Sequence, residues 1–88
     1  MRVQRADDVL FEFIDGTAVL VDPGGRELYT LNPVGSLVWD ALAEHGQPGP
    51  LADALLPKVE GVARDQLESD ISVFLAELRT AGLVVDRA

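Results

Sequence analysis

The chain is organised around residues 9–31, VLFEFIDGTAVLVDPGGRELYTL, where three apolar, β-branched runs are separated by two turn sequences. Asp15-Gly16 supplies the positive φ angles that a two-residue type I′ hairpin requires. Asp22-Pro23-Gly24-Gly25 predicts a second turn, because proline presets φ and the glycines can adopt left-handed conformations. We therefore expect a three-stranded antiparallel meander with strands at about 9–14, 17–22 and 26–31.

After Leu31 the apolar spacing changes from that of strands to that of helices. Asn32-Pro33 combines a preferred N-cap with the residue best tolerated at the first helical position, so a helix is expected to begin there. Pro57 is expected to end a short second helix, and Gly82 to cap a long third one. The three helices are predicted at about 33–45, 50–57 and 64–81. Residues 83–85 are expected either to pack on the core or to add a stub of strand.

The composition restricts the class of protein. A chain of 88 residues supports one small core, so we expect a single domain over residues 1–88. The chain has no cysteine, no apolar run long enough to span a membrane and no secretory signal, which favours a soluble, cytoplasmic protein with no membrane partner. Seven Lys and Arg against fifteen Asp and Glu give a net charge of −8, which disfavours nucleic acid as a partner.

Catalytic and metal-binding chemistry has little support in the sequence. The single histidine, His45, falls near the expected end of the first helix, where an imidazole interacts favourably with the helix dipole. The serines lack the context of a nucleophile elbow, and the carboxylates do not follow the spacing of a calcium loop. We therefore expect no enzymatic activity, no metal and no cofactor. Trp39 is expected in the core, with a contact in a partner groove as the alternative.

The third strand suggests a function. Its Leu28–Leu31 segment contains neither the lysine nor the proline that commonly protects an edge strand. An extended peptide could add a fourth strand there, with the third helix as the second wall of the groove. The alternative is that a helix or residues 83–85 cover this edge. Whether Leu28 or Tyr29 points outward stays open, because a shift of one residue reverses the parity.

Three segments also resemble a known family. Residues 19–22 and 25–39, which include the Leu-Asn-Pro-x-Gly junction at 31–35, and the closing Ala81-Gly82-Leu83-Val84 are similar to the PqqD-like family. These are the peptide-recognition domains, or RiPP recognition elements, of ribosomal natural-product pathways. The resemblance implies an α+β, winged helix-turn-helix-like fold with three strands packed on three helices, and no catalysis. It also implies that the leader segment of a precursor peptide binds as an antiparallel strand on the third strand.

The resemblance further implies a set of site residues and partners. Asp70 either pairs locally or contacts the peptide, and the second helix departs from the family pattern through its prolines. The partner enzyme is a radical SAM enzyme in pyrroloquinoline quinone synthesis, or a leader peptidase and a cyclase in lasso-peptide pathways, which the sequence slightly favours. The enzyme could dock on the helix with Trp39 or on the acidic face of the third helix. The expected peptide-binding residues are Glu27, Leu28, Tyr29, Thr30, Leu31, Leu67, Asp70, Ile71, Phe74, Glu77 and Leu78.

Two other functions stay open. The first is an acidic winged-helix module for protein interaction or homodimerisation through the edge strand, and we expect a monomer or a weak dimer. The second is DNA binding, which is less favoured, because the third helix carries Arg64 and Arg79 against four carboxylates.

Overall fold

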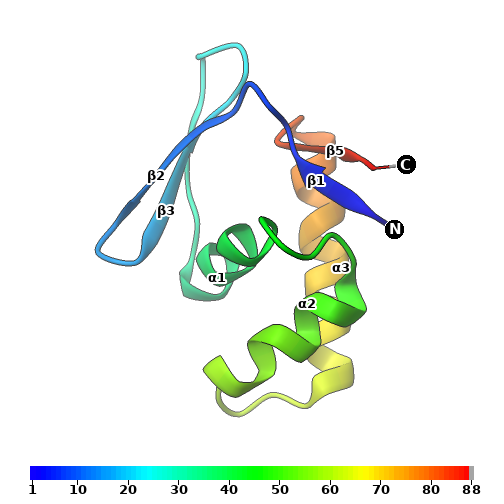
Figure 1. Ribbon diagram of the computed structural model, residues 1–88. Coiled ribbons are helices and arrows are strands. Elements are labelled where there is room, and N and C mark those ends of the chain that lie inside the picture. Colours follow the sequence, from blue (N-terminus) through cyan, green and yellow to red (C-terminus); the bar gives the residue numbers. More distant parts are fainter. Residues whose placement is uncertain (88) are drawn as a thin grey trace.

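Residues 1–87 are described by the structure, a computed structural model of the chain. They form an α+β fold with a three-stranded antiparallel sheet, three helices and a second, two-stranded sheet (Figure 1). The elements are β1 (Val3–Arg5), β2 (Leu10–Ile14), β3 (Thr17–Val21), β4 (Leu28–Thr30), α1 (Pro33–Ala41), α2 (Pro48–Leu55), α3 (Arg64–Thr80) and β5 (Val84–Asp86). A single 3₁₀ turn, Leu56–Lys58, follows α2. Among the described residues, no helix is both long and apolar enough to cross a membrane.

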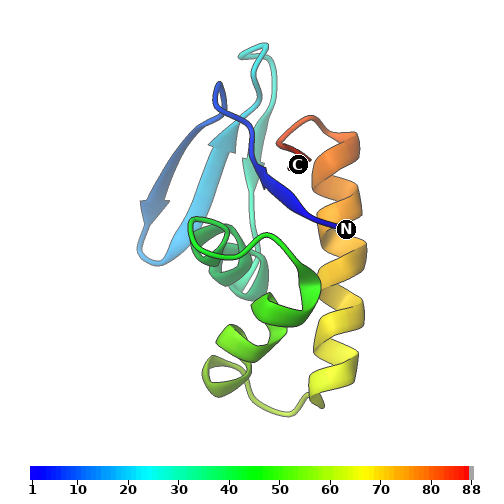
Figure 2. The ribbon, with the colours of Figure 1, turned by 45° about the vertical axis from the view of Figure 1, so that its right-hand side comes forward.

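The larger sheet has the strand order β2-β3-β4, as expected for a meander. Asp15 and Gly16 adopt φ angles of 52° and 80°, so the predicted type I′ turn joins β2 to β3. The hairpin of β2 and β3 projects from the body of the molecule (Figure 1). α3 stands as a long column beside the sheet, and α2 packs along the lower half of that column (Figure 2).

Two element boundaries differ from the prediction because side chains compete for backbone groups. β4 begins at Leu28 rather than near residue 26, since Asp22 Oδ1 accepts hydrogen bonds from the N–H groups of Arg26 (2.7 Å) and Glu27 (3.3 Å) and holds them in the turn. α1 ends at Ala41 rather than near residue 45. There the guanidinium of Arg5 donates to the carbonyls of Trp39 and Asp40, and the chain leaves the helix through shorter-range bonds.

The second helix begins earlier than expected. α2 starts at Pro48, with this proline at the first helical position, instead of near residue 50. Pro57 does not end the helix at once, because it lies inside the 3₁₀ turn that continues α2 to Lys58. α3 keeps its predicted start at Arg64, and Gly82 follows it with a φ of 78°, the left-handed conformation expected of a cap.

The sequence does not predict β1, because residues 1–8 look polar and irregular. Val3 is nevertheless fully buried, and β1 pairs antiparallel with β5 in the register Val3↔Asp86 and Arg5↔Val84. The closing residues therefore form a strand with β1 on top of α3 and do not cover β4 (Figure 1). The alternative in which residues 83–85 cover the third strand of the meander is wrong.

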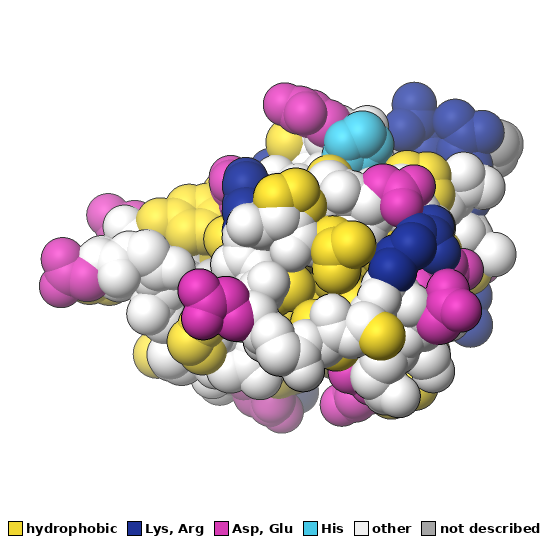
Figure 3. Space-filling view, turned by 90° about the horizontal axis from the view of Figure 1, so that it is seen from below, with side chains coloured by type: hydrophobic (Ala, Val, Ile, Leu, Met, Phe, Trp, Pro, Cys, Tyr) yellow, Lys and Arg dark blue, Asp and Glu magenta, His cyan; other side chains and the backbone are white. Residues whose placement is uncertain are grey.

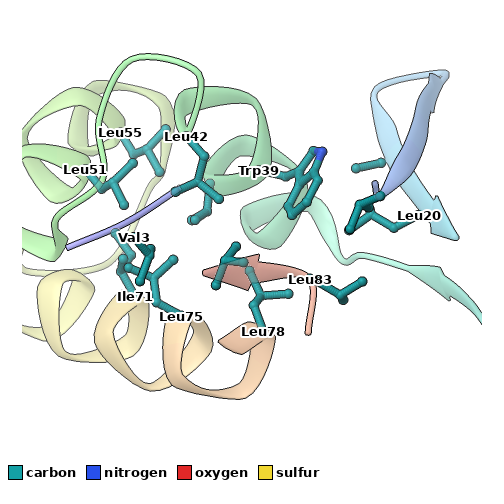
Figure 4. Close-up of a cluster of buried hydrophobic side chains, with 14 of the residues drawn as sticks. Val3, Leu20, Trp39, Leu42, Leu51, Leu55, Ile71, Leu75, Leu78 and Leu83 are labelled. Atoms are coloured by element: carbon teal, nitrogen blue, oxygen red, sulfur yellow. The ribbon is translucent and has the colours of Figure 1, made fainter. Parts of the chain in front are cut away.

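One hydrophobic core joins the sheet, the three helices and the β1–β5 pair (Figure 4). Trp39 of α1 is fully buried between the helices and Leu20 of β3, which confirms its expected place in the core. Its burial also removes it as a docking residue for a partner enzyme. The largest fully buried side chains are Trp39, Leu20, Leu51, Leu55, Ile71, Leu75 and Leu83, with Val3, Val38 and Val84.

Candidate functional site

β4 is an open edge: in the part of the chain that the structure describes, its only hydrogen-bonded neighbour is β3. The N–H of Leu31 donates to the carbonyl of Ala18 (2.9 Å), and the carbonyl of Glu27 accepts from the N–H of Asp22 (3.1 Å). Because backbone groups alternate along a strand, the N–H and C=O of Leu28 and Thr30 point away from β3. The structure thus answers the question of parity that the sequence leaves open.

The side chains of β4 alternate between the core and the outer face of the sheet. Tyr29 lies opposite the buried Leu20 and is half-buried on the core side, whereas Leu28 is 68% exposed on the other face. The Tyr29 hydroxyl donates to Glu27 Oε2 (2.9 Å). This hydrogen bond, and to a smaller extent the neighbouring negative charges, raise the pKa of Tyr29 above its usual value, so the phenol stays neutral.

Ser36 fixes the end of β4 against β3 and α1. Its Oγ accepts from the N–H of Ala18 (2.9 Å) and donates to the carbonyl of Leu31 (3.3 Å), although the residue is only 2% exposed. Asn32, the N-cap of α1, accepts the N–H of Gly35 (2.7 Å) on its side-chain oxygen. The junction between edge strand and helix is therefore held by two side chains at the start of α1, Asn32 and Ser36.

A cavity of about 450 Å³ lies between the start of α1, residues 59–62 and one side of α3. Its apolar side chains are contributed by all three segments, and its charged side chains are all acidic. On the underside of the molecule, hydrophobic side chains gather in the centre, with both acidic and basic side chains around them (Figure 3). The cavity is lined by Asn32, Val34, Gly35, Val38, Val59, Glu60, Val62, Leu67, Asp70, Ile71, Phe74 and Glu77.

Gly35 connects this cavity to the end of β4. A Cβ atom at residue 35 would lie 3.1 Å from Cζ of Phe74 and 3.5 Å from Cβ of Leu31. The absence of a side chain therefore lets the Phe74 ring of α3 approach the residue that follows β4. The cavity therefore begins at Asn32 and Gly35, close to the end of β4, although no residue of β4 itself lines it.

The structure brings together most of the site residues expected on α3, but not all. Leu67, Asp70, Ile71, Phe74 and Glu77 line the cavity, whereas Leu78 is 4% exposed, packs in the core and does not line it. The N-terminal side of the cavity also includes Asn32, Val34, Gly35 and Val38 of the α1 segment, which sequence reasoning did not assign to the site. Asp70 lines the cavity and also accepts a local hydrogen bond from Gln66 (2.8 Å).

Sequence reasoning likewise missed Val59, Glu60 and Val62, because residues 58–63 look like a connector. Two valines in a segment of only six residues were the available signal, since connectors that face solvent are usually polar. A glycine in the first turn of α1 was a second signal, because such a position usually reflects a close approach.

The arginines of α3 are engaged with carboxylates. Arg64 donates to Asp53 (2.6 Å) and to Glu68, and Arg79 donates to Asp86 (3.1 Å). The hydrogen bond from Arg64 lowers the pKa of Asp53 below its usual range. α3 therefore has no free basic side chain with which to contact phosphates, which weighs against DNA binding. Within residues 1–87, no group of His, Cys, Asp and Glu side chains is placed to hold a metal ion.

Comparison with known families assigns the chain. A model of the family described as coenzyme PQQ synthesis protein D (PqqD) matches residues 17–84, from β3 to the start of β5. The chain belongs to the PqqD family. Members of this family are non-catalytic, so the expectation that the chain is not an enzyme is confirmed.

Two solved structures resemble this PqqD-family chain over nearly its whole length. One, described as TbiB1 in complex with the TbiA(beta) leader peptide, has 29% sequence identity, a TM-score of 0.85, and covers 97% of this chain and 98% of that chain. The other, described as lasso peptide synthetase B1 complexed with the leader peptide, has 24% identity, a TM-score of 0.81, and covers 97% and 99%. The similarity confirms the predicted winged helix-turn-helix-like α+β fold. A search of curated proteins gave no significant match.

Proposed function

We propose that this chain binds the leader segment of a ribosomally made precursor peptide as an antiparallel strand on β4 and presents the rest of the precursor to a modifying enzyme. The open edge of β4 carries this proposal, because the N–H and C=O groups of Leu28 and Thr30 point away from β3. Extended peptides add to such edges through main-chain hydrogen bonds. The similarity to TbiB1, which is described with a leader peptide, supports the same reading.

The cavity beside β4 supplies the selectivity. A leader strand sends alternate side chains to each face, so one apolar side chain enters the cavity and packs on Ile71 and Phe74. Glu60, Asp70 and Glu77 are the charged residues that line it. The bound leader therefore carries Lys or Arg close to its apolar anchor, because acidic side chains favour positive charge on a ligand.

The partner enzymes follow from the type of pathway. We favour a lasso-peptide pathway, with a leader peptidase and a cyclase, because Tyr29 and the Asn-Pro-Val-Gly-Ser run at 32–36 resemble members of that type. A radical SAM enzyme of pyrroloquinoline quinone synthesis is the second choice, given the family. The chain acts as a monomer or weak dimer in the cytoplasm, where precursor peptides are made.

The first test is a titration of the isotopically labelled chain with the synthetic leader of its precursor peptide. We expect amide chemical shifts to change at residues 27–31 and along the cavity side of α3. A spectrum that stays unchanged at about millimolar peptide would contradict leader binding, since that concentration corresponds to a binding free energy of only about −4 kcal/mol.

A proline substitution tests strand addition itself. Thr30→Pro removes an N–H that points away from β3, so the fold should persist, as edge strands tolerate proline on their open side. Leader affinity should fall at least about tenfold, equivalent to about 1.4 kcal/mol. Thr30→Val keeps the N–H and is the matched control, and it should bind like the wild type. Equal affinities of the two variants, measured by calorimetry, would show that the leader does not pair with β4.

A further inference from the structure

β2 is exposed along its whole length, although four of its five residues are apolar. The exposed fractions of Leu10, Phe11, Phe13 and Ile14 are 71%, 41%, 39% and 54%. A strand of a small sheet normally buries at least one face, whereas β2 leaves apolar side chains exposed on both faces, which indicates an interaction site at this edge of the sheet. We call these four side chains the β2 patch.

The β2 patch is held in a fixed geometry. Phe11 packs edge-on against Trp39, with ring centroids 5.5 Å apart, and against Phe13 at 6.1 Å. The guanidinium of Arg5 lies 4.6 Å from the centroid of the Phe11 ring. This anchoring leaves Phe13 on one face of the projecting hairpin and Leu10 and Ile14 on the other. Hydrophobic side chains are visible on this hairpin, which extends to the left in Figure 3.

A bound leader leaves the patch free. β2 and β4 are opposite edges of the sheet, with β3 between them. Strands lie about 4.8 Å apart, so the two edges are separated by roughly 10 Å. A peptide strand on β4 and a protein on β2 can therefore be bound at the same time.

The charges around the patch select the kind of partner. Every charged residue from 7 to 17 is acidic: Asp7, Asp8, Glu12 and Asp15. The basic Arg5 also lies against Phe11, but its guanidinium donates its hydrogen bonds to the carbonyls of Trp39 and Asp40. A second copy of the chain is disfavoured, because antiparallel pairing centred on β2 would place Glu12 opposite Glu12, and like charges in that position are destabilising. A partner with Lys or Arg beside an apolar groove is complementary to both the acidic charge and the apolar side chains of this region.

We infer that the β2 patch is the docking surface for the enzyme that acts on the bound precursor, a protein with an apolar groove flanked by basic side chains. The identity of this partner rests on the proposed function, since a chain that presents a leader must itself be recognised by the enzyme. Aromatic side chains such as Phe13 are common anchors of protein interfaces.

The test uses Phe13→Ser and Ile14→Ser, which alter opposite faces of β2 without removing a core side chain. Val85→Ser is the matched control, because Val85 is also an apolar strand residue, 42% exposed, but lies in β5. The affinity of each full chain is measured for the synthetic leader by calorimetry and for the purified enzyme encoded with the precursor by biolayer interferometry. Sedimentation gives the oligomeric state.

We expect Phe13→Ser and Ile14→Ser each to lower enzyme affinity by about tenfold and to leave leader affinity within about twofold, with Val85→Ser unchanged in both. Glu12→Lys should weaken enzyme binding as well. Unchanged enzyme affinity in both serine variants overturns the inference, and so does a wild-type dimer that Phe13→Ser dissociates. If the wild-type chain does not bind the leader, that result contradicts the proposed function and leaves the inference about the β2 patch to be decided by the enzyme affinities.

Discussion

Ser36 connects three elements through one buried hydroxyl group. It stands in α1, accepts the N–H of Ala18 in β3 and donates to the carbonyl of Leu31 at the end of β4. In an unbroken ladder, the N–H of Ala18 would instead donate directly to the carbonyl of Leu31. The position of β4 relative to α1, and hence the shape of the groove, depends on this inserted hydroxyl.

Ser36→Ala should lower the free energy of unfolding by about 1–3 kcal/mol, because the buried N–H of Ala18 loses its partner. Urea unfolding followed by circular dichroism measures the change. Ser69→Ala, at an exposed position of α3, is the control and should change stability by less than about 0.5 kcal/mol. If Ser36→Ala lowers the free energy of unfolding no more than Ser69→Ala does, the hydroxyl of Ser36 is not needed, because a water or a small shift of the strand satisfies the N–H of Ala18 instead.

At the scale of elements, β1 can lie in its place only because residue 46 has no side chain. A Cβ atom at Gly46 would lie 2.3 Å from the carbonyl oxygen of Val3. In addition, the carbonyl of Gly46 accepts the N–H of Val3 (2.8 Å). The segment after α1 thus holds the first strand, whose Val3 is part of the core.

Gly46→Ala should therefore displace β1 and lower the free energy of unfolding by about 1–3 kcal/mol, the range for overpacking. Amide exchange should speed up in β1 and β5 first. Gly49→Ala is the matched control, since its Cβ would meet only Nη2 of Arg64, at an ordinary 3.7 Å. A Gly46→Ala variant as stable as Gly49→Ala would mean that the close approach is relieved by a small movement of the chain.

The elements that sequence could predict are those with boundaries set by neighbouring residues. Asp15-Gly16, Asn32-Pro33 and Gly82 each fix a turn or a cap locally, and the structure has all three where they were expected. β1 was missed because a three-residue strand carries no detectable period and depends on β5, which lies eighty residues away along the chain. The start of α2 was misplaced because Pro48 and Pro50 both suit a first turn.

On the scale of the whole molecule, acidic charge is spread widely but has different roles in different places. On α3, Arg64 and Arg79 neutralise nearby carboxylates, whereas the charged residues lining the cavity are all acidic. A net charge of −8 also repels other acidic proteins, including copies of this chain. Binding of a leader with basic residues should therefore depend on salt.

Leader affinity should fall as salt rises from about 0.05 to 0.5 M, because screening weakens attraction between exposed charges. Asp70→Asn and Glu77→Gln should each lower affinity about two- to fivefold at low salt, as expected for exposed pairs worth up to about 1 kcal/mol. Asp15→Asn, at the tip of the hairpin, changes the net charge equally and should have little effect. A leader affinity that does not change with salt concentration would contradict the prediction that the leader carries basic residues beside its apolar anchor.

The candidate site was only partly predictable, because some of its residues are brought together by the tertiary fold and not by local sequence pattern. The positions on α3 follow from helical spacing, so five of its six expected residues line the cavity, while Leu78 turns into the core. Val59 and Val62 join the cavity only when the chain folds back past α1, and two valines in a short connector are a signal of burial that does not say against which element they pack. The parity of β4 likewise needed the hydrogen bonds to β3.

The pairing of β1 with β5 has a mechanical consequence. The ladder runs from Arg2 and Arg87 at the free ends to Ala6 and Leu83 at the closed end. A force that pulls the two ends apart would break these bonds one after another, as in a zipper, instead of loading them together. A protease complex that unfolds its substrates by pulling on a terminus would therefore open this pair first and uncover Val3 and Val84.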